Sequence, residues 1–280
     1  ININIVKKII CHFQLPDPNE RLQLVVFLKK YIELHEKEHA PILFMIKNAM
    51  IFLNDEFYNG YCLVPIISIF SHIILKYYSK LKEEILNVFF EAFVPLVSYN
   101  YASLSFQHFK NVFLLMIRTD RDLAYLILKK LQKLWPHQNN SKQAAYTDLL
   151  ISISASLDHR IFEKFSLNFF SFLRDLLFSQ QFKLVDTIIN IFVNESYSSW
   201  LTENSTILID KLFEPISIIS ILSSDKLTKN KCMNALKTMS TMNNSEFNKC
   251  ELVFKNKQKV LENQLLKMSK NKNQPNQYLT

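Results

Sequence analysis

Residues 106–134 read FQHFKNVFLLMIRTDRDLAYLILKKLQKL, and this stretch decides the fold class. Its apolar side chains recur every three or four positions on both sides of Thr119-Asp120, which is the spacing of one face of an α-helix. They are Phe106, Phe109, Phe113 and Met116 before the break, and Leu123, Leu126, Ile127, Leu131 and Leu134 after it. Because Thr and Asp favour caps and turns, the stretch predicts two helices joined by a short connection.

The same spacing fills most of the chain, and no segment of comparable length alternates as a strand does. One further stripe consists of Phe165, Phe169, Phe172, Leu173 and Leu176. Taken in pairs, the helices cover residues 82–118, 121–156, 159–194 and 203–243, close to the roughly 40-residue period of HEAT and armadillo arrays. A helix pair cannot bury its apolar face alone, so it stacks on its neighbours. We predict an all-α fold, an α-solenoid of HEAT/armadillo-like helix pairs over residues 1–270, with a polar, disordered tail at 271–280.

Breaks between the helices are marked by Pro, Asn, Asp and Ser, the residues that favour turns and caps. They fall at residues 15–19, 54–60, 98–102, 119–120, 136–141, 157–158 and 223–224. The segments between them predict helices of roughly 12 to 18 residues.

The composition fits a folded intracellular protein, with 49% hydrophobic residues among 280. Gly60 is the single glycine, so phosphate-cradling loops and dinucleotide fingerprints are absent. The four cysteines, Cys11, Cys62, Cys232 and Cys250, form no Cys-x-x-Cys pair, which predicts reduced thiols. We expect no cofactor, and a location in the cytoplasm with the nucleus as a further location.

The net charge of +8 is concentrated near the C-terminus. Residues 249–280 hold seven lysines and two glutamates, a net charge of +5, which leaves +3 for the rest of the chain. The body of the protein is therefore nearly balanced, and we expect no nucleic-acid partner. A phosphate-binding role for the lysine-bearing terminal helix is the alternative.

The most apolar segment, residues 61–75, is interrupted by Pro65, Ser68, Ser71 and His72. It is also shorter than the roughly 20 residues that a membrane helix needs. We predict a buried helix here and no membrane span. Residues 1–5 carry no basic region or cleavage site, so we expect no signal peptide.

Residues 35–39 read His-Glu-Lys-Glu-His and match the His-Glu-x-x-His pattern of zinc peptidases. In such an enzyme His35 and His39 would ligate zinc and Glu36 would act as the general base. The intervening positions are charged, however, and Pro41 disfavours a helix just before it. We predict a solvated turn and keep a zinc peptidase as the alternative. Since no nucleophile can be nominated either, we expect no catalytic residue, no metal site and no enzyme.

Tyrosines gather in or beside predicted connections, at Tyr77, Tyr78, Tyr99 and Tyr101. We predict that they are exposed and cover repeat edges, with contact to a partner protein as the alternative.

A series of short motifs follows the chain in one order and with near-constant spacing. It consists of Asp17-Pro18-Asn19-Glu20-Arg21, Asn59-Gly60, Lys82-Glu83-Glu84, Pro95-Leu96, Ser103-Leu104-Ser105, Leu134-Trp135-Pro136, Ser179-Gln180-Gln181-Phe182, Asn194-Glu195, and Phe247 to Lys255 with Cys250. No single motif is specific, but their shared order resembles the regulatory B-prime subunit family of protein phosphatase 2A over most of the chain.

The resemblance implies a HEAT-like solenoid that performs no catalysis. Subunits of this family dock on a scaffold subunit and a metal-dependent serine/threonine phosphatase subunit, and they recruit substrates that carry a short Leu-x-x-Ile-x-Glu motif. Recruitment raises the effective substrate concentration at the phosphatase. The implied partners are therefore the scaffold subunit, the catalytic subunit and short linear motifs of substrates. A generic HEAT-repeat adaptor without phosphatase docking is the alternative.

The resemblance also places a motif-binding groove at seven positions: Lys29, Lys30, Ile32, His39, Ile67, Lys82 and Ile85. The family has His-Arg at the first two positions, Tyr at the third and Arg at the fourth. Ile67 and Lys82 match the residues that the family has at these positions, whereas Ile85 replaces a histidine. Because lysine and histidine cannot reproduce the bidentate arginine fork on a carboxylate, we predict weak or altered motif specificity. By the same comparison, residues 9–13 correspond to a helix well inside the family's array, so counterparts of its first helices are missing from this sequence.

Overall fold

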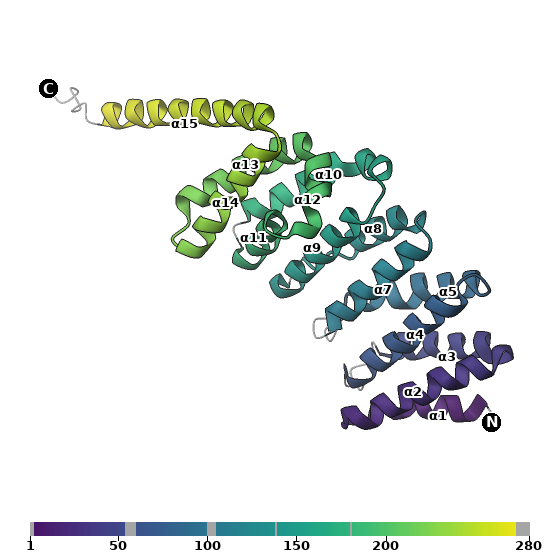
Figure 1. Cartoon of the computed structure of the whole chain (residues 1–280). Helices are drawn as coiled ribbons and strands as arrows, with labels where there is room; N and C mark the ends of the chain where they lie inside the picture. The colour runs from purple at the N-terminus through teal and green to yellow at the C-terminus, as the bar shows by residue number, and fades with distance from the viewer. Residues whose placement is uncertain (1–2, 54–59, 100–104, 138, 180, 273–280) are drawn as a thin grey trace. The chain divides into compact units, whose positions relative to one another are not determined.

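The computed structural model describes residues 3–53, 60–99, 105–137, 139–179 and 181–272 (Figure 1). Within these ranges the chain forms helices and turns and no strand, which confirms the all-α prediction. The chain divides into two compact units, residues 1–157 and 158–280. Parts of the predicted breaks at 54–60 and 98–102, together with Tyr101 and residues 273–280 of the predicted tail, lie outside the described residues.

The first unit stacks helix pairs in two rows. Its elements are α1 (Ile3–His12), α2 (Pro18–Leu34), η1 (Glu36–Glu38), α3 (His39–Phe52), η2 (Gly60–Cys62), α4 (Leu63–Tyr77), α5 (Lys82–Val88), η3 (Phe89–Phe93), α6 (Val94–Leu96), α7 (Phe106–Thr119), α8 (Leu123–Lys133) and α9 (Asn140–Ala155). In one row α2, α4, α7 and α9 pack one on the next, and in the other α1 packs on α3 and α3 on α5 (Figure 1). This stacking of neighbours is the solenoid arrangement that the period predicts.

The second unit is built around one long helix. Its elements are α10 (His159–Phe178), α11 (Phe182–Ile189), η5 (Asn190–Phe192), η6 (Glu195–Tyr197), α12 (Ser198–Glu203), α13 (Ser205–Leu222), α14 (Lys226–Met242) and α15 (Asn244–Lys272). The central helix α13 contacts α10, α12, α14 and α15, while α11 contacts α10 and α14. The short α12 is an addition to the predicted pairs.

Aspartates begin several helices at the predicted breaks. Asp17 accepts a hydrogen bond from the amide of Asn19 at 2.8 Å, and Asp158 accepts one from Arg160 at 3.0 Å. Asp225 accepts one from the amide of Thr228 at 2.8 Å. These side chains satisfy amides that have no partner inside the helix, so the turn residues in the sequence fix the starts of α2, α10 and α14.

A cluster of phenyl rings forms the centre of the first unit. Phe93 lies 5.1 Å from Phe109, 5.4 Å from Phe113 and 5.5 Å from Phe89, measured between ring centroids. All four side chains are fully buried. The stripe predicted for α7 is thus confirmed at Phe109, Phe113 and Met116. In α10 the buried stripe instead follows Phe162, Phe169, Phe170, Leu173 and Leu177, so that Phe165, Phe172 and Leu176 are half-buried.

A π-helical turn, η3, precedes Pro95. The amide of Val94 bonds to the carbonyl of Phe89, five residues earlier. Proline has no amide hydrogen and crowds the preceding turn, so the helix widens locally before Pro95 instead of ending there.

Polar contacts join corresponding helices of successive repeats. Lys29 Nζ donates to Ser68 Oγ at 2.9 Å, and Lys110 Nζ donates to Asp148 at 2.8 Å. In the second unit Lys257 Nζ donates to Glu214 at 2.9 Å. The partners in these and similar contacts are 38 to 45 residues apart in sequence, which confirms the roughly 40-residue period. Further members of the series are Lys47–Glu91, Lys76–Glu33, Lys80–Glu36 and Lys231–Asp186.

The apolar helix α4 packs against α2, α3 and α7. Gly60–Tyr77 is long and apolar enough to be a candidate membrane span by length and composition, but half of this window is buried inside the protein. Ile66, Ile67, Phe70, Ile73 and Ile74 are among its buried side chains. The predicted buried helix is confirmed, and the absence of a membrane span stays a prediction.

Candidate functional site

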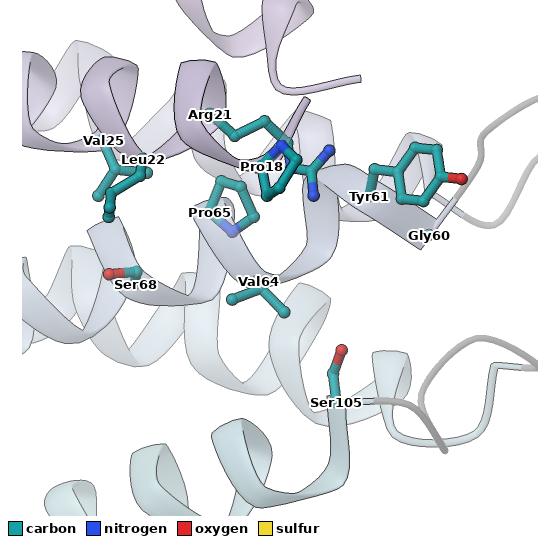
Figure 2. A pocket seen from close by; sticks show the side chains of 10 residues that line it. All are labelled: Pro18, Arg21, Leu22, Val25, Gly60, Tyr61, Val64, Pro65, Ser68 and Ser105. Atoms are coloured by element: carbon teal, nitrogen blue, oxygen red, sulfur yellow. The ribbon is translucent and has the colours of Figure 1, made fainter. Parts of the chain in front are cut away.

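Two neighbouring cavities lie along α2, α4 and α7 in the first unit. The apolar pocket has a volume of about 580 Å³ and is lined by Pro18, Arg21, Leu22, Val25, Gly60, Tyr61, Val64, Pro65, Ser68 and Ser105 (Figure 2). The basic pocket has a volume of about 470 Å³ and is lined by Lys29, Ile67, Ser68, Ser71, His72, Leu75, His108, Asn111, Leu114, Leu115 and Arg118. Because both include Ser68, the two pockets adjoin.

The apolar pocket combines prolines, aliphatic side chains and one fixed arginine. Figure 2 shows Pro18 and Leu22 of α2 on one side, with Pro65 of α4 facing them. Arg21 donates hydrogen bonds to the carbonyls of Leu15 and Pro16, and its guanidinium carbon lies 5.0 Å from the centre of the Tyr61 ring. These contacts hold Arg21 and Tyr61 together as one wall of the pocket.

The basic pocket takes its polar side chains from three neighbouring helices, with Lys29 on α2 and the others on α4 and α7. On α4 they are Ser68, Ser71 and His72, and on α7 they are His108, Asn111 and Arg118. Residues three or four apart share one face of a helix, so each set points into the same groove. No carboxylate belongs to the lining, although Glu33 lies close by on α2.

Lys29 and His72 are the half-buried titratable side chains of the basic pocket. Burial lowers the pKa of Lys29, whose Nζ is bonded to a serine hydroxyl and not to a carboxylate. Burial also lowers the pKa of His72, and the charges of Lys29 and Lys76 act in the same direction. His72 Nε2 lies 3.4 Å from Glu33, a carboxylate that Lys76 already holds. His72 is therefore neutral at pH 7.

The structure separates the seven predicted groove positions into accessible and buried ones. Lys29 lines the basic pocket and Lys30 is exposed on α2, while Ile67 borders the same pocket but is itself buried. Ile32 and Ile85 are fully buried, so neither side chain is accessible to a peptide.

His39 and Lys82, the other two groove positions, are engaged with their own chain. His39 is buried; its Nε2 donates to the carbonyl of Ile32 at 2.7 Å, and its ring lies 4.2 Å from that of Tyr77. Lys82 Nζ lies 2.8 Å from Asp120.

The His-Glu-x-x-His segment spans a helix end, η1 and the first residue of α3. The predicted turn is present at residues 35–38, but the segment is not solvated throughout, because His39 is buried and α3 already includes the residue before Pro41. His35 Nδ1 donates to the carbonyl of Tyr31 at 2.9 Å, and Glu36 pairs with Lys80 at 2.7 Å. His39 donates to the carbonyl of Ile32, so each of the two imidazoles has one ring nitrogen hydrogen-bonded to a backbone carbonyl. The two histidines are not on one helical face, so the geometry does not favour a zinc peptidase.

One other group of potential metal ligands is found in the described part of the chain. Asp210, Glu246 and Cys250 place one ligand atom each within 4.8 Å of one another. Lys211 pairs with Asp210 at 2.8 Å and Lys249 with Glu246 at 3.1 Å. Burial raises the pKa of the Cys250 thiol, so the sulfur stays protonated at neutral pH. The group is explained by ion pairing without a metal.

The tyrosines predicted to be exposed are half-buried at positions 77, 78 and 99. Tyr77 packs on His39, and the hydroxyl of Tyr78 donates to Asp120 at 2.9 Å. Burial and this hydrogen bond raise the pKa of Tyr78. The prediction was wrong here because Tyr77 packs against the tilted ring of His39 and Tyr78 reaches a carboxylate of the next repeat.

Sequence reasoning missed most residues of the two pockets, although one signal was present. Ser68, Ser71 and His72 interrupt the apolar run of α4 at positions three or four apart, which marks a polar stripe on an otherwise buried helix. Arg21 and Arg118 carried no comparable signal.

Comparison with known proteins gives this helical array its family. A family model described as "Protein phosphatase 2A regulatory B subunit (B56 family)" matches residues 1–275. The chain belongs to this B56 family. Its members are regulatory subunits of the phosphatase and not its catalytic subunit, which confirms the predicted resemblance.

Two curated relatives of this B56 chain are regulatory subunits of protein phosphatase 2A by name. Regulatory subunit psrA of Dictyostelium discoideum is 22% identical over 249 residues, which cover 88% of the chain and 40% of the relative. The 56 kDa regulatory subunit delta 1 isoform of Schizosaccharomyces pombe is 22% identical over 257 residues, which cover 91% of the chain and 46% of the relative. The chain thus spans less than half the length of both relatives.

Proposed function

We propose that this chain is a non-catalytic regulatory subunit of a protein phosphatase 2A holoenzyme, binding the scaffold and catalytic subunits and recruiting substrates. Membership of the B56 family over residues 1–275 carries the proposal. A stack of helix pairs supports it, since such arrays present long surfaces to other proteins. The subunit would work in the cytoplasm, with the nucleus as a further location.

Substrate recruitment is assigned to the α2–α4–α7 face. Two of the seven groove positions implied by the family, Lys29 and Ile67, line the basic pocket, and Lys30 is exposed beside it. Burial of Ile32, His39 and Ile85 supports altered specificity for the Leu-x-x-Ile-x-Glu motif. Charge reversal at Lys29 and Lys30 should then change substrate binding, and a Leu-x-x-Ile-x-Glu peptide should bind more weakly than it binds other members.

The experiment that tests the proposal is reconstitution with purified scaffold and catalytic subunits, read by co-elution on size-exclusion chromatography. A stable ternary complex is expected. Its absence at micromolar concentrations of all three proteins would favour the alternative, a HEAT-repeat adaptor without phosphatase docking. Metal analysis of the same preparation separates both from a zinc peptidase.

A further inference from the structure

The basic pocket has a surplus of positive charge. Lys29 and Arg118 are the two basic side chains of the lining, and neither forms an ion pair among the residues that the structure describes, although burial lowers the pKa of Lys29. His72 and His108 add ring nitrogens that can form hydrogen bonds with an anion. Glu33, the acid beside His72, is held by Lys76. A partly desolvated cation that lacks a carboxylate partner favours an anion in its vicinity.

The adjoining apolar pocket is suited to a bulky apolar side chain. Leu22, Val25, Val64 and Pro65 supply aliphatic surface, and Tyr61 adds a ring that is 50% exposed. Arg21 is held by backbone carbonyls, so its charge is partly satisfied within the chain. None of the seven groove positions implied by the family lines this cavity.

The centres of the two pockets are close enough for an extended peptide to reach both with side chains a few residues apart. On α4 the middle of the apolar pocket is near Val64 and that of the basic pocket is near Ser71. Seven residues of α-helix rise by about 10 Å. An extended segment covers this distance in about three residues.

We propose that the apolar pocket is a second anchor of the recruitment face, which binds an extended acidic segment. The segment places a bulky apolar side chain in the apolar pocket and, about three residues away, an anionic side chain in the basic pocket. This inference rests on the proposed function, because it names the class of segment that a substrate would present. Charge complementarity selects the occupant: the basic pocket offers lysine and arginine donors and no carboxylate.

The anion can be a carboxylate or a phosphate, and both use the same donors. Arg118 offers a planar fork that matches either group, and Lys29 has two further N–H groups beyond the one bonded to Ser68. A phosphoserine carries more charge and three acceptor oxygens, so it would engage more of these donors at once.

Binding of fluorescein-labelled peptides to the 280-residue chain tests the proposal by anisotropy. The probes carry Leu-Ala-Ala-Glu, Leu-Ala-Ala-phosphoserine, both reversed orders, and matched peptides with Ala for Leu or Gln for Glu, in neutral flanks. In the better order, Leu should improve affinity about tenfold or more over Ala, as expected for one buried aliphatic side chain. The Glu and phosphoserine arms then distinguish a carboxylate from a phosphate ligand.

Matched substitutions on the same helices make the test specific. Leu22→Asp should abolish the gain from Leu, and Val26→Asp should not, because both side chains are exposed on α2 but only Leu22 lines the pocket. Arg118→Glu should weaken every anionic peptide, whereas Arg121→Glu, just beyond α7, should not. No gain from Leu in either order, or a gain that Leu22→Asp leaves intact or that Val26→Asp equally removes, would overturn the proposal.

Assembly with scaffold and catalytic subunits, measured on the same variants, separates this inference from the proposed function. Leu22→Asp should co-elute with both subunits while losing the Leu-containing peptide. If the unsubstituted chain binds the peptides but does not assemble, the second anchor stands and the phosphatase role fails. If it assembles but Leu contributes nothing, the regulatory role stands and the second anchor is refuted.

Discussion

Removing the carboxylate of Asp120 should destabilise the first unit, because this residue joins the end of α7 to the turn between α4 and α5. Its Oδ2 accepts a hydrogen bond from the Tyr78 hydroxyl at 2.9 Å and lies 2.8 Å from Lys82 Nζ. A hydrogen bond to a charged group contributes about 1.5–3 kcal/mol, while the half-exposed Lys82 adds about 0–1 kcal/mol. Asp120→Ala should therefore lower the free energy of unfolding by about 1.5–4 kcal/mol.

Urea denaturation of the chain, followed by circular dichroism at pH 7, measures this loss. The two compact units can unfold in separate transitions, and the change should be confined to the one that belongs to residues 1–157. Asp122→Ala is the matched control: its side chain is exposed and makes no capping hydrogen bond although it stands at the start of α8, so it should change stability by less than about 0.5 kcal/mol.

A double-mutant cycle with Tyr78→Phe isolates the hydrogen bond between the two repeats, and we expect a coupling energy of about 1–2 kcal/mol. The hydrogen bond with Lys82 is the main cause that keeps the pKa of Asp120 below 3.8. The stabilisation should accordingly be complete above this value and disappear as the pH falls through the lower pKa of the folded state. A destabilisation by Asp120→Ala below about 0.5 kcal/mol, or a coupling energy near zero, would refute the reasoning.

Three further predictions concern the core, the thiols and metal. Phe93→Ala should lower the free energy of unfolding by about 3–5 kcal/mol, and exposed Phe44→Ala by less than about 0.5 kcal/mol, both measured in urea. Burial raises the pKa of the Cys62 thiol to about 11. At pH 8 iodoacetamide should therefore alkylate exposed Cys11 and spare Cys62 until urea is added. Equal labelling of both cysteines, measured by mass spectrometry without urea, would contradict the burial of Cys62. EDTA should leave the melting temperature unchanged; stoichiometric zinc that is lost on His35→Ala would instead revive the peptidase alternative.

The periodic part of the fold could be predicted from the sequence because burial on one side of a helix repeats every three or four residues. Phe109 and Phe113 show this directly, since both are at predicted core positions and both are fully buried. The starts of α2 and α10 could also be predicted from the sequence, because Asp17 and Asp158 accept hydrogen bonds from amides only two residues away. What was missed is non-periodic: the π turn before Pro95 and the short α12 depend on how the chain closes locally.

The candidate site was less predictable because it depends on contacts between side chains of different helices in neighbouring repeats. His39 occupied a groove position in the alignment, yet it is buried against Tyr77 and bonded to the carbonyl of Ile32. Arg118 looked like an ordinary helix-terminal residue, yet it shares a cavity with Lys29, which is 89 positions earlier in the chain. Such proximities follow from stacking and not from local spacing.

The regular polar contacts between repeats have a consequence for how each unit comes apart. Every contact of this series joins helices that are close in the array, so no bond in it ties one end of a unit to the other. When a terminal repeat unfolds, the contacts between the remaining repeats of that unit therefore stay in place. Within each unit, protection from hydrogen exchange should consequently decline by steps toward the ends instead of vanishing everywhere at once.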